Sequence, residues 1–421
     1  MSPSLSYDAV VLGAGVAGLT AATRLAQGGA RACVLSKGVG STHLAPGTVD
    51  VLGYSPQRVE SPAAALPDFV AARPAHPYAL IGIDAIAPAL EWFAGRIESG
   101  PQPAYRYVGG LERNHLLPTA LGGIRPSALV PETMAAGDVR AGKPVCVVGM
   151  RVLRDFHASL CAGNLRRAGV ASRAVEVDVD VGRTEASALG LARHFDDESF
   201  RAAFAARLAL LLRPGEHVAL PAVLGLRDPH GAWSDLQRRL GRAVFEVPTL
   251  PPSAPGIRVY NALVAALRAA GGRLLLGAEV VDVERDGERV TAVRARTSGH
   301  DTLFRTRWVV LATGGFTSGG IELSSDWRGR ETILGLSLRG MPAPAEARFT
   351  ADYFGPQPMS EVGVAVDSSL LAGGTENVFV AGAALPGAVS WREGSGEGIA
   401  LATGHFVAHA VLERERVTAT A

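Results

Sequence analysis

The sequence predicts an α/β fold built on a parallel β-sheet, and three observations carry this prediction. A short apolar strand, a glycine-rich turn and a helix follow one another over Tyr7–Leu25. A second apolar strand, starting at Arg307, ends in Ala312-Thr313-Gly314-Gly315. A third strand ends at Gly382, before a glycine-rich helix start at Gly396. Strands that end in small residues before a helix are typical of sheets that bind ligands at their carboxyl ends.

The first of these stretches has the G-x-G-x-x-G spacing of a Rossmann-like FAD/NAD(P)-binding domain. Gly13 permits the sharp turn out of the strand, Gly15 leaves room for a phosphate, and Gly18 lets the helix pack closely on the sheet. The free N–H groups and the dipole of the helix N-terminus then hold the anion. The motif predicts a bound nucleotide or flavin phosphate, and the alternative is a purely structural strand–turn–helix unit.

The position that binds the adenosine ribose in such folds holds no acidic residue. An Asp or Glu about 20 positions past the glycines usually bonds this ribose, and Ser36 and Lys37 stand there instead. This weakens an NAD interpretation and leaves two alternatives. The ligand lacks the second nucleotide, as FMN does, or Ser36 makes a weaker hydrogen bond to the ribose.

A loop of small and hydroxyl residues follows this strand, from Gly38 to Asp50. It includes Ser41 and Thr42 and suits close approach of the backbone to an isoalloxazine ring, with a solvated turn as the alternative. His43 is the only titratable side chain between Lys37 and Asp50, which makes it a candidate proton donor or acceptor. A structural hydrogen bond is the alternative for His43.

Composition excludes several classes of protein. The chain has 41 Lys and Arg against 40 Asp and Glu, so its net charge of +1 predicts no binding to nucleic acid or to an acidic membrane surface. The 3 cysteines have no C-x-x-C spacing and cannot supply the ligands of an iron–sulfur cluster, and no metal site is predicted. No apolar run approaches about 18 residues and no signal peptide is evident, so we expect a cytoplasmic chain without a membrane span of its own.

Changes in pattern along the chain predict three segments. Residues 1–56 form the N-terminal part of a flavin-binding domain. Residues 57–247 form an inserted α/β substrate or cap domain, because further strands and helices alternate there without phosphate-binding glycines. The proline-rich stretch Val247–Arg258 marks the return to the first domain. Residues 248–421 then form its C-terminal part.

The returning segment has the pattern of a two-dinucleotide-binding-domain flavoprotein. A small meander is predicted from Arg273 through the run near Leu303, before the strand that ends at Gly314. The strand ending at Gly382 precedes the last helix, whose first amides would face the pyrimidine edge of a flavin, where negative charge develops on reduction. The residues that supply these amides are Gly396, Glu397 and Gly398. One non-covalent flavin per chain is therefore expected.

Six further segments carry a closer likeness. They are G-A-G-V-A-G-L from Gly13, H-L-A-P-G-T-V-D from His43, A-H-P-Y from Ala75, K-P-V-C-V-V-G from Lys143, V-P-T-L-P-P-S-A-P-G-I-R from Val247 and F-G-P-Q-P from Phe354. Through them nearly the whole chain resembles the B-subunit family of anaerobic glycerol-3-phosphate dehydrogenase. The P-T-L-P-P-S part is the most specific, because no general flavoprotein pattern explains it.

This resemblance implies a flavoprotein that contains FMN and works with two partners. One is the A subunit, which is catalytic and contains FAD. The other is the C subunit, which carries iron–sulfur clusters and is attached to the membrane. Together they would oxidise sn-glycerol 3-phosphate to dihydroxyacetone phosphate and reduce a quinone. The chain would then be cytoplasmic and peripheral to the inner face of the cell membrane through a partner subunit. Whether this chain or the A subunit oxidises the alcohol stays open.

Two features keep other functions open. The turn Arg392–Gly398 holds no cysteine that could act near the flavin. The stretch from Val34 to Thr42 resembles L-aspartate oxidase and fumarate-reductase-type enzymes, which hold FAD with a serine at the ribose position. A self-contained FAD oxidoreductase is the first alternative, although Arg392-Glu393 with His405 only partly matches its substrate residues. A flavin-free structural subunit is the second, and the intact glycines argue against it.

Oxidation of an alcohol that carries a phosphate requires a base and a phosphate contact. A general base with a pKa of about 7 accepts the proton, and a positively charged pocket holds the dianion. His43 is the candidate base and Arg258 the candidate anion contact. Arg258 can equally pair with a carboxylate.

Overall fold

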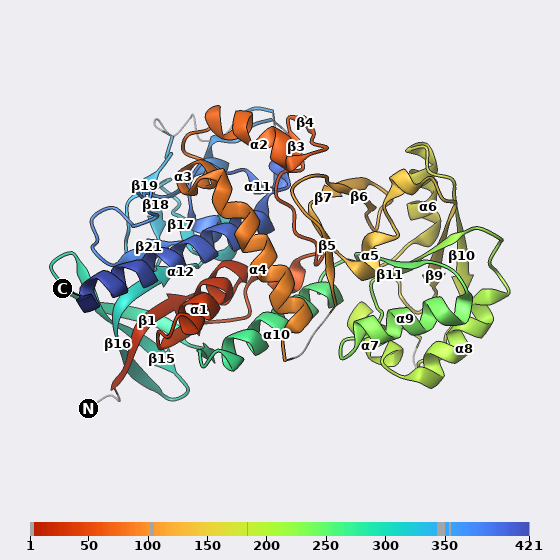
Figure 1. The fold of residues 1–421 in the computed structure, drawn as a ribbon, viewed down its shortest axis with the longest axis horizontal. Helices are drawn as coiled ribbons and strands as arrows, with labels where there is room; N and C mark the ends of the chain where they lie inside the picture. The colour runs from red at the N-terminus through yellow and green to blue at the C-terminus, as the bar shows by residue number, and fades with distance from the viewer. Residues whose placement is uncertain (1–3, 102–104, 183, 343–349, 353–354, 421) are drawn as a thin grey trace.

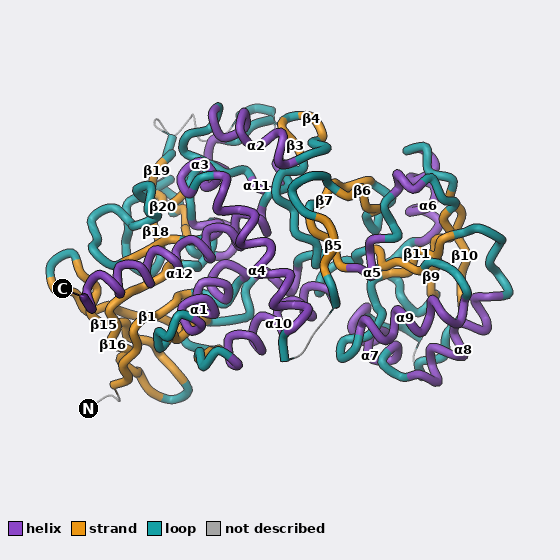
Figure 2. Tube along the Cα trace, in the orientation of Figure 1, coloured by secondary structure: helices purple, strands orange, loops and turns teal. Residues whose placement is uncertain are grey.

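The computed structural model describes residues 4–101, 105–182, 184–342, 350–352 and 355–420. Phe354, the first residue of the F-G-P-Q-P segment, lies outside them. Figure 1 shows two lobes: a larger one made from both ends of the chain and a smaller one made from its middle. The longer strands gather in two sheets, one in each lobe, and three short strands lie between the lobes, β5 (Tyr107–Gly109), β6 (His115–Pro118) and β7 (Ile124–Ser127) (Figure 2). This arrangement confirms the predicted α/β fold.

The larger lobe is built on a seven-stranded sheet. Its parallel part has the order β13 (Arg273–Leu276), β2 (Ala32–Ser36), β1 (Ser4–Leu12), β16 (His300–Leu311) and β21 (Val378–Val380). The N-terminal motif thus lies in the middle of the sheet, between strands that come from the C-terminal third of the chain. The carboxyl ends of β1, β16 and β21 meet at one edge, where the three small-residue segments follow them.

A three-stranded meander extends this sheet, as the sequence predicts. β14 (Glu279–Asp286) pairs antiparallel with β15 (Arg289–Thr297), and β15 pairs antiparallel with the first half of β16. Two details differ from the prediction. The first part of the meander, which begins at Arg273, is divided at Gly277, whose φ is +77°, into β13 and β14. The run near Leu303 and the strand from Arg307 are one strand, because β16 pairs with β15 over its first half and with β21 over its second.

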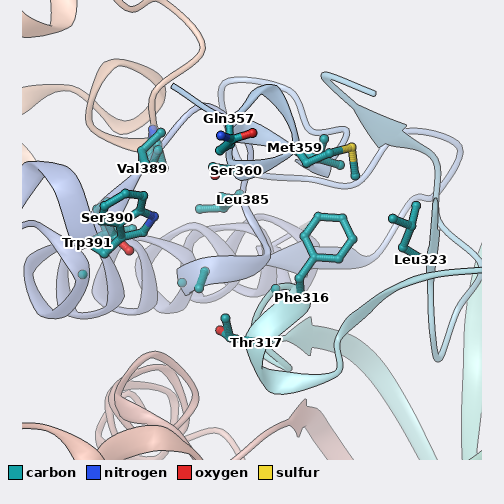
Figure 3. Close-up of a pocket in the computed structure, with 18 residues that line it drawn as sticks. Phe316, Thr317, Leu323, Gln357, Met359, Ser360, Leu385, Val389, Ser390 and Trp391 are labelled. Atoms are coloured by element: carbon teal, nitrogen blue, oxygen red, sulfur yellow. The ribbon is translucent and has the colours of Figure 1, made fainter. Parts of the chain in front are cut away.

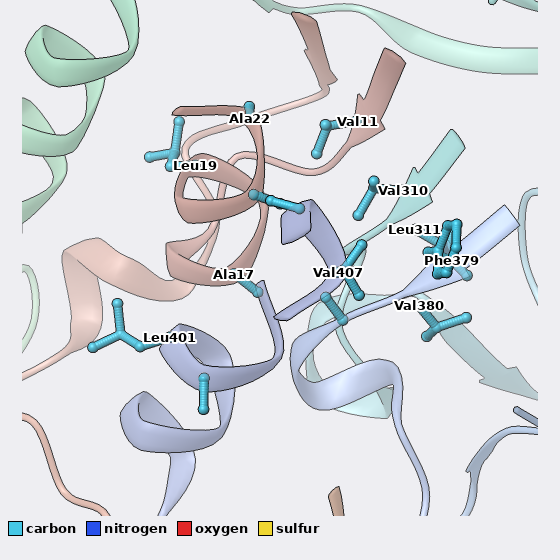
Figure 4. Packing of buried hydrophobic residues seen from close by; sticks show 14 of the residues in the cluster. Val11, Ala17, Leu19, Ala22, Val310, Leu311, Phe379, Val380, Leu401 and Val407 are labelled. Atoms are coloured by element: carbon cyan, nitrogen blue, oxygen red, sulfur yellow. The ribbon is translucent and has the colours of Figure 1, made fainter. Parts of the chain in front are cut away.

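Helices α1 (Val16–Gln27) and α12 (Gly396–Thr420) pack against each other on this sheet. A Cβ atom on Gly404 would lie 2.4 Å from the carbonyl oxygen of Ala17, so a glycine is needed where the two helices cross. Figure 4 shows side chains of both helices converging with those of the sheet, Ala17, Val407 and Val310 among them. The crossing brings the start of α12 to the same edge of the sheet as the first glycine turn.

Three helices that the sequence assigns to the inserted domain pack on the larger lobe. They are α2 (Pro62–Ala71), α3 (Pro77–Ile81) and α4 (Ile86–Ser99). Leu66, Tyr78 and Phe93 are buried in the same hydrophobic cluster as β1 and α1. The separate hydrophobic core of the smaller lobe therefore begins later in the chain than the predicted boundary at Gln57.

The smaller lobe holds a four-stranded parallel sheet with its own core. Its order is β10 (Ser172–Val177), β9 (Val145–Met150), β11 (His217–Pro221) and β12 (Val244–Val247). The helices around it are α6 (Ala158–Arg167), α7 (Ala188–Phe195), α8 (Glu198–Ala209) and α9 (Pro229–Leu240). A hydrophobic cluster running from Val145 to Ala254 forms its interior, separate from the first. We call this lobe the cap.

Short strands and two helices join the lobes. They are β5 (Tyr107–Gly109) with β8 (Leu129–Pro131), β6 (His115–Pro118) with β7 (Ile124–Ser127), α5 (Glu132–Ala135) and α10 (Ala254–Ala269). α10 begins inside the predicted break, because the Ser253 hydroxyl caps it by accepting from the Gly256 N–H and Pro255 fits its first turn.

The remaining elements of the larger lobe are short. They are β3 (Tyr54–Ser55) with β4 (Gln57–Arg58), β17 (Ile321–Leu323) with β18 (Gly329–Glu331), β19 (Leu338–Arg339) with β20 (Gly363–Val364), and α11 (Ser390–Glu393). Within the described residues, no helix combines the length and hydropathy needed to cross a membrane.

Candidate flavin-binding site

The first glycine turn has the geometry that its spacing predicts. Gly13 has a φ of +113°, and a Cβ there would lie 2.3 Å from the carbonyl oxygen of Ala312. A Cβ on Gly18 would lie 2.0 Å from the carbonyl oxygen of Gly13. Both glycines are therefore required by close packing between the turn, α1 and the end of β16. Their predicted conformational roles are confirmed.

Gly15 differs from its two neighbours because it faces open space. It directly precedes α1 in an extended conformation, and a Cβ on it would meet no described atom within 4 Å. Gly40 approaches from the loop after β2, since a Cβ there would lie 3.0 Å from the Gly15 backbone. The first turn of α1 carries no acidic residue that would repel an anion. The turn thus offers a phosphate cradle that a side chain at position 15 would fill.

The two residues at the predicted ribose position lie at the carboxyl end of β2. The Ser36 hydroxyl donates to the Gly38 carbonyl at 2.6 Å, which leaves its lone pairs available to a ribose hydroxyl. The Lys37 ammonium forms an exposed ion pair with Glu279 at 2.9 Å. Ser36 remains a predicted cofactor contact. Lys37 points toward the start of β14, where Glu279 lies.

The loop after β2 contains one turn of 3₁₀ helix at Ser41–Leu44. Ser41 is exposed, whereas Thr42 is buried. The His43 ring packs edge-on against Tyr260 of α10, with 4.7 Å between the ring centroids. Burial lowers the pKa of His43, so its imidazole is neutral at pH 7 and able to accept a proton.

Buried polar atoms without a partner occur in the loops that follow β2 and β16. Among the described residues, the hydroxyls of Thr42 and Thr313 and the Nε2 atom of His43 find no hydrogen-bond partner. Buried polar groups in folded proteins are nearly always paired. Unpaired groups beside an open glycine turn are what a site built for a polar cofactor would contain. The described residues therefore fit a flavin nucleotide.

A cavity of about 440 Å³ lies beside the start of α12. Figure 3 shows Phe316, from the loop after β16, with Gln357, Met359 and Ser360 across the cavity. Gly382 and Gly396, two of the predicted cofactor residues, also line it, as does Gly315, the neighbour of Gly314. None of the described residues that line it is Asp, Glu, Lys, Arg or His. The cavity therefore suits an uncharged, largely apolar group.

The glycines that end β16 and β21 are held by tight packing. Gly314 has a φ of +79°, and a Cβ there would lie 2.6 Å from Ser318. Gly382 has a φ of +73°, and its N–H donates to the Thr403 hydroxyl of α12 at 2.9 Å. The ends of β16 and β21 are thus fixed against α1 and α12, at the edge where the cofactor is expected.

The start of α12 departs from the prediction in one respect. The Gly398 N–H donates to the carbonyl oxygen of Asp50 at 3.0 Å, so this amide is not available to a flavin. A Cβ on Gly398 would also lie 2.4 Å from the Tyr78 hydroxyl, which explains the glycine. Of the three predicted amides, those of Gly396 and Glu397 remain candidates.

Arg258 has a structural role in place of the predicted contact with a substrate anion. Its guanidinium is buried and donates to both carboxylate oxygens of Glu246, at 2.7 and 3.0 Å. Its Nε atom donates to the Gly225 carbonyl at 2.8 Å. All three guanidinium nitrogens are used inside the protein. The alternative noted for Arg258, pairing with a carboxylate, is the one observed.

A charged cluster that sequence reasoning missed lies between the lobes. The carboxylate of Asp50 is fully buried and accepts from the Ser127 hydroxyl at 2.6 Å and from Arg125 at 2.7 Å. Burial, and then the charge of Asp50, raises the pKa of nearby Glu397 to about 7. The Arg125 side chain is 44% exposed. A partly exposed cation and a carboxyl that titrates near neutrality therefore meet at the start of α12.

Part of this cluster has a signal in the sequence. Asp50 ends the H-L-A-P-G-T-V-D segment. His76 lies outside the cluster, in A-H-P-Y, and its Nε2 atom is 3.2 Å from the carboxylate of Glu393. Both segments are specific, but neither pattern says which partner a side chain meets. Arg125 and Ser127 lie on β7 in no recognisable motif.

Comparisons with known proteins agree with this geometry. A family model described as "FAD binding domain" matches residues 8–399. The anaerobic glycerol-3-phosphate dehydrogenase B subunit of Pectobacterium carotovorum is 32% identical over 424 residues, which cover 97% of this chain and 99% of the relative. The probable B subunit of the same dehydrogenase in Halobacterium salinarum is 33% identical over 433 residues, with 97% and 99% covered.

Two solved structures are similar to this chain at lower sequence identity. The open conformation of a flavocytochrome c3 fumarate reductase is 10% identical, covers 98% of this chain and 79% of its own, and has a TM-score of 0.45. Mycobacterium smegmatis Sdh1 in complex with UQ1 is 12% identical, with 98% and 69% covered and a TM-score of 0.44.

Proposed function

The chain belongs to the family of anaerobic glycerol-3-phosphate dehydrogenase B subunits, within the FAD-binding-domain flavoproteins, and from this premise we propose that it is the flavin-containing subunit of such a dehydrogenase. The complex would oxidise sn-glycerol 3-phosphate to dihydroxyacetone phosphate, with a quinone as final acceptor. One observation carries the proposal. The phosphate cradle at Gly15 is open in a chain that matches the named relatives over 97% of its length.

FAD takes the place of FMN in this proposal. The resemblance alone implies FMN, whereas the family whose model matches the chain is an FAD binding domain. The Ser36 hydroxyl at the end of β2 can accept from a ribose hydroxyl. The missing acidic residue therefore does not require a ligand without the adenosine half.

The residues that would hold FAD come from four segments. The Gly15 turn and the N-terminus of α1 would bind the pyrophosphate. The hydroxyls of Thr42 and Thr313 would gain the partners they lack. The amides of Gly396 and Glu397, at the positive end of the α12 dipole, would face the pyrimidine edge. When bound, the flavin supplies the two-electron acceptor that alcohol oxidation requires.

For the case in which this chain, and not the A subunit, oxidises the alcohol, His43 is our proposed proton acceptor. Its ring is neutral and its Nε2 atom is unpartnered among the described residues. Replacing His43 by Gln should lower the turnover of glycerol 3-phosphate by the assembled dehydrogenase by roughly 10²–10⁴-fold, which is the usual effect of losing a general base. The FAD content should stay unchanged, because the ring is assigned no contact with the pyrophosphate. A turnover equal to that of the wild type would remove His43 from this role.

Electrons would leave through partner subunits. No described group of three or more His, Cys, Asp or Glu residues could hold a metal ion. Cys33, Cys146 and Cys161 are buried, and burial raises the pKa of each thiol to about 11. We therefore propose two partners, the catalytic, FAD-containing A subunit of the same dehydrogenase and its iron–sulfur C subunit. The chain would lie on the cytoplasmic side, attached to the membrane through a partner.

A self-contained FAD oxidoreductase is the second candidate. The cluster of Arg125, Asp50 and Glu397 favours it, because an anion contact and a titratable carboxyl lie together at the junction of the lobes. Assays with glycerol 3-phosphate and a water-soluble quinone, with and without the A and C subunits, separate the two candidates. Activity only with partners supports the first candidate, and full activity of this chain alone supports the second.

A further inference from the structure

The loop of residues 389–396 forms one wall of the cavity and leads directly into α12. Val389, Ser390, Trp391 and Gly396 all line the cavity, and Figure 3 shows the first three of them along one side. The shape of this loop therefore sets both the wall of the cavity and the position of the first amides of α12. The Gly53 N–H donates to the carbonyl oxygens of Glu393 and Gly394, and one buried carboxylate, that of Glu393, connects the two ends of the loop to each other and to His76.

The Glu393 carboxylate connects the two ends of the loop. One oxygen accepts from the Val389 N–H at 3.0 Å. The other accepts from the Ser395 hydroxyl at 2.8 Å and lies 3.2 Å from Nε2 of His76. Only 9% of the Glu393 side chain is exposed. Each oxygen is thus occupied by groups that flank cavity-lining positions.

His76 anchors this carboxylate to the rest of the lobe. The Tyr78 N–H donates to its Nδ1 atom at 3.1 Å, so the ring carries its proton on Nε2 and donates it to Glu393. The imidazole is fully buried and caps α3, whose first residue, Pro77, also lines the cavity. His76 and Glu393 are 317 positions apart in the chain. Their contact therefore joins two walls of one cavity.

The pair holds a charge in the interior. Burial alone would raise the pKa of Glu393, but the hydrogen bonds from His76, Val389 and Ser395 outweigh burial and lower it. Glu393 is therefore an ionised carboxylate at neutral pH. Replacing it by an amide would turn an NH₂ group toward at least one donor and leave that donor unpaired.

We propose that His76 and Glu393 are positioning residues that hold the 389–396 loop in the shape that binds the flavin. Neither side chain needs to touch the cofactor, since both act through Val389, Ser395 and Pro77. This inference rests on the proposed function, because it requires a flavin at the start of α12. It assigns to the buried His76–Glu393 pair an effect on the affinity for FAD and on the surroundings of the bound flavin.

The test compares two matched amide variants, Glu393→Gln and Glu246→Gln. Both carboxylates are buried, and both accept from three or more donors. Glu246 lies on β12 of the cap, so its variant reproduces the loss of a buried charge away from the cavity. FAD affinity is measured by fluorescence titration of apoprotein, and the flavin environment by visible circular dichroism of the loaded protein.

Glu393→Gln should weaken FAD binding by at least about tenfold and change the circular dichroism of the bound flavin, as the loss of a charged hydrogen bond predicts. Glu246→Gln should bind FAD with the wild-type affinity, even where its thermal stability falls by as much as that of Glu393→Gln. His76→Gln, whose amide N–H can still reach the carboxylate, should bind more tightly than His76→Ala.

Wild-type affinity and an unchanged spectrum in Glu393→Gln would overturn the inference, as would equal losses in the two amide variants. If Glu393→Gln does not fold, equal affinity of His76→Gln and His76→Ala would overturn it. Failure of the wild-type chain to bind FAD would instead overturn the proposed function, and the inference with it, so the two failures are distinguishable.

Discussion

Arg258 of α10 donates to both carboxylate oxygens of Glu246 on β12, at 2.7 and 3.0 Å, in the interior of the protein. Glu246 also accepts from the Thr133 hydroxyl and the Leu224 N–H, each at 2.9 Å. The pair joins the helix that returns to the flavin-binding lobe to the last strand of the cap sheet. Its role is to connect the lobes.

Breaking this pair should therefore lower stability and leave substrate binding intact. Arg258→Met leaves the Glu246 carboxylate buried without its cation, which should cost roughly 3–5 kcal/mol of unfolding free energy. Urea unfolding measures this loss, and the double variant Arg258→Met/Glu246→Leu should recover most of it. If Arg258→Met instead raised the KM for glycerol 3-phosphate and left stability unchanged, Arg258 would be a contact for the substrate anion and not a structural residue.

A side chain at Gly15 should abolish flavin retention. Gly15→Val fills the open cradle with its ordinary φ of −75° unchanged, so the fold should persist. Loss of several charge-assisted hydrogen bonds to the phosphates should weaken binding by on the order of 3 kcal/mol or more. Gly95→Val is the matched control, because Gly95 in α4 also faces open space. Equal flavin content in both variants and the wild type would show that the first turn does not bind the cofactor.

Glu397 should make stability depend on pH near neutrality. Its pKa is raised from 4.5 to about 7 in the folded protein, by burial and then by Asp50. The folded state therefore holds a proton that the unfolded state releases, so this group lowers stability as pH rises from about 4.5 to about 7. Glu397→Gln removes this titration. The unfolding free energy of Glu397→Gln minus that of the wild type should therefore rise between about pH 5 and about pH 8. A difference that does not change with pH would contradict the raised pKa of Glu397.

Turnover should require the partner subunits. The isolated chain should show little or no glycerol-3-phosphate:quinone activity, because its three cysteines are free and buried and its described residues contain no group that could hold a metal cluster. The A subunit should co-purify when the two are expressed together, and activity should appear once both the A and the C subunits are present. A chain that turns over fully by itself would establish the self-contained oxidoreductase instead.

Local patterns predict the parts of the site that depend on neighbouring residues. Gly13 and Gly18 follow from spacing alone, since the turn and the helix they serve are adjacent in the chain. The strands ending at Gly314 and Gly382 follow from their apolar runs and small terminal residues.

Contacts between distant residues could not be predicted in the same way. The amide of Gly398 donates to the carbonyl of Asp50 because α12 begins beside the loop that contains Asp50, and no periodicity in the sequence indicates this contact. Glu393 meets His76 across 317 positions. The carboxylate that pairs with Arg258 was equally hidden, although only 12 positions separate the two, because the contact depends on how α10 meets β12.

The most direct test of this account is the cofactor itself. The chain is purified, gently desalted and examined by visible absorption, and any flavin is released by heat and identified by chromatography. We predict close to one non-covalently bound FAD per chain, held by the Gly15 turn and the start of α12. A colourless protein that cannot be reconstituted with FAD or FMN would contradict the central claim.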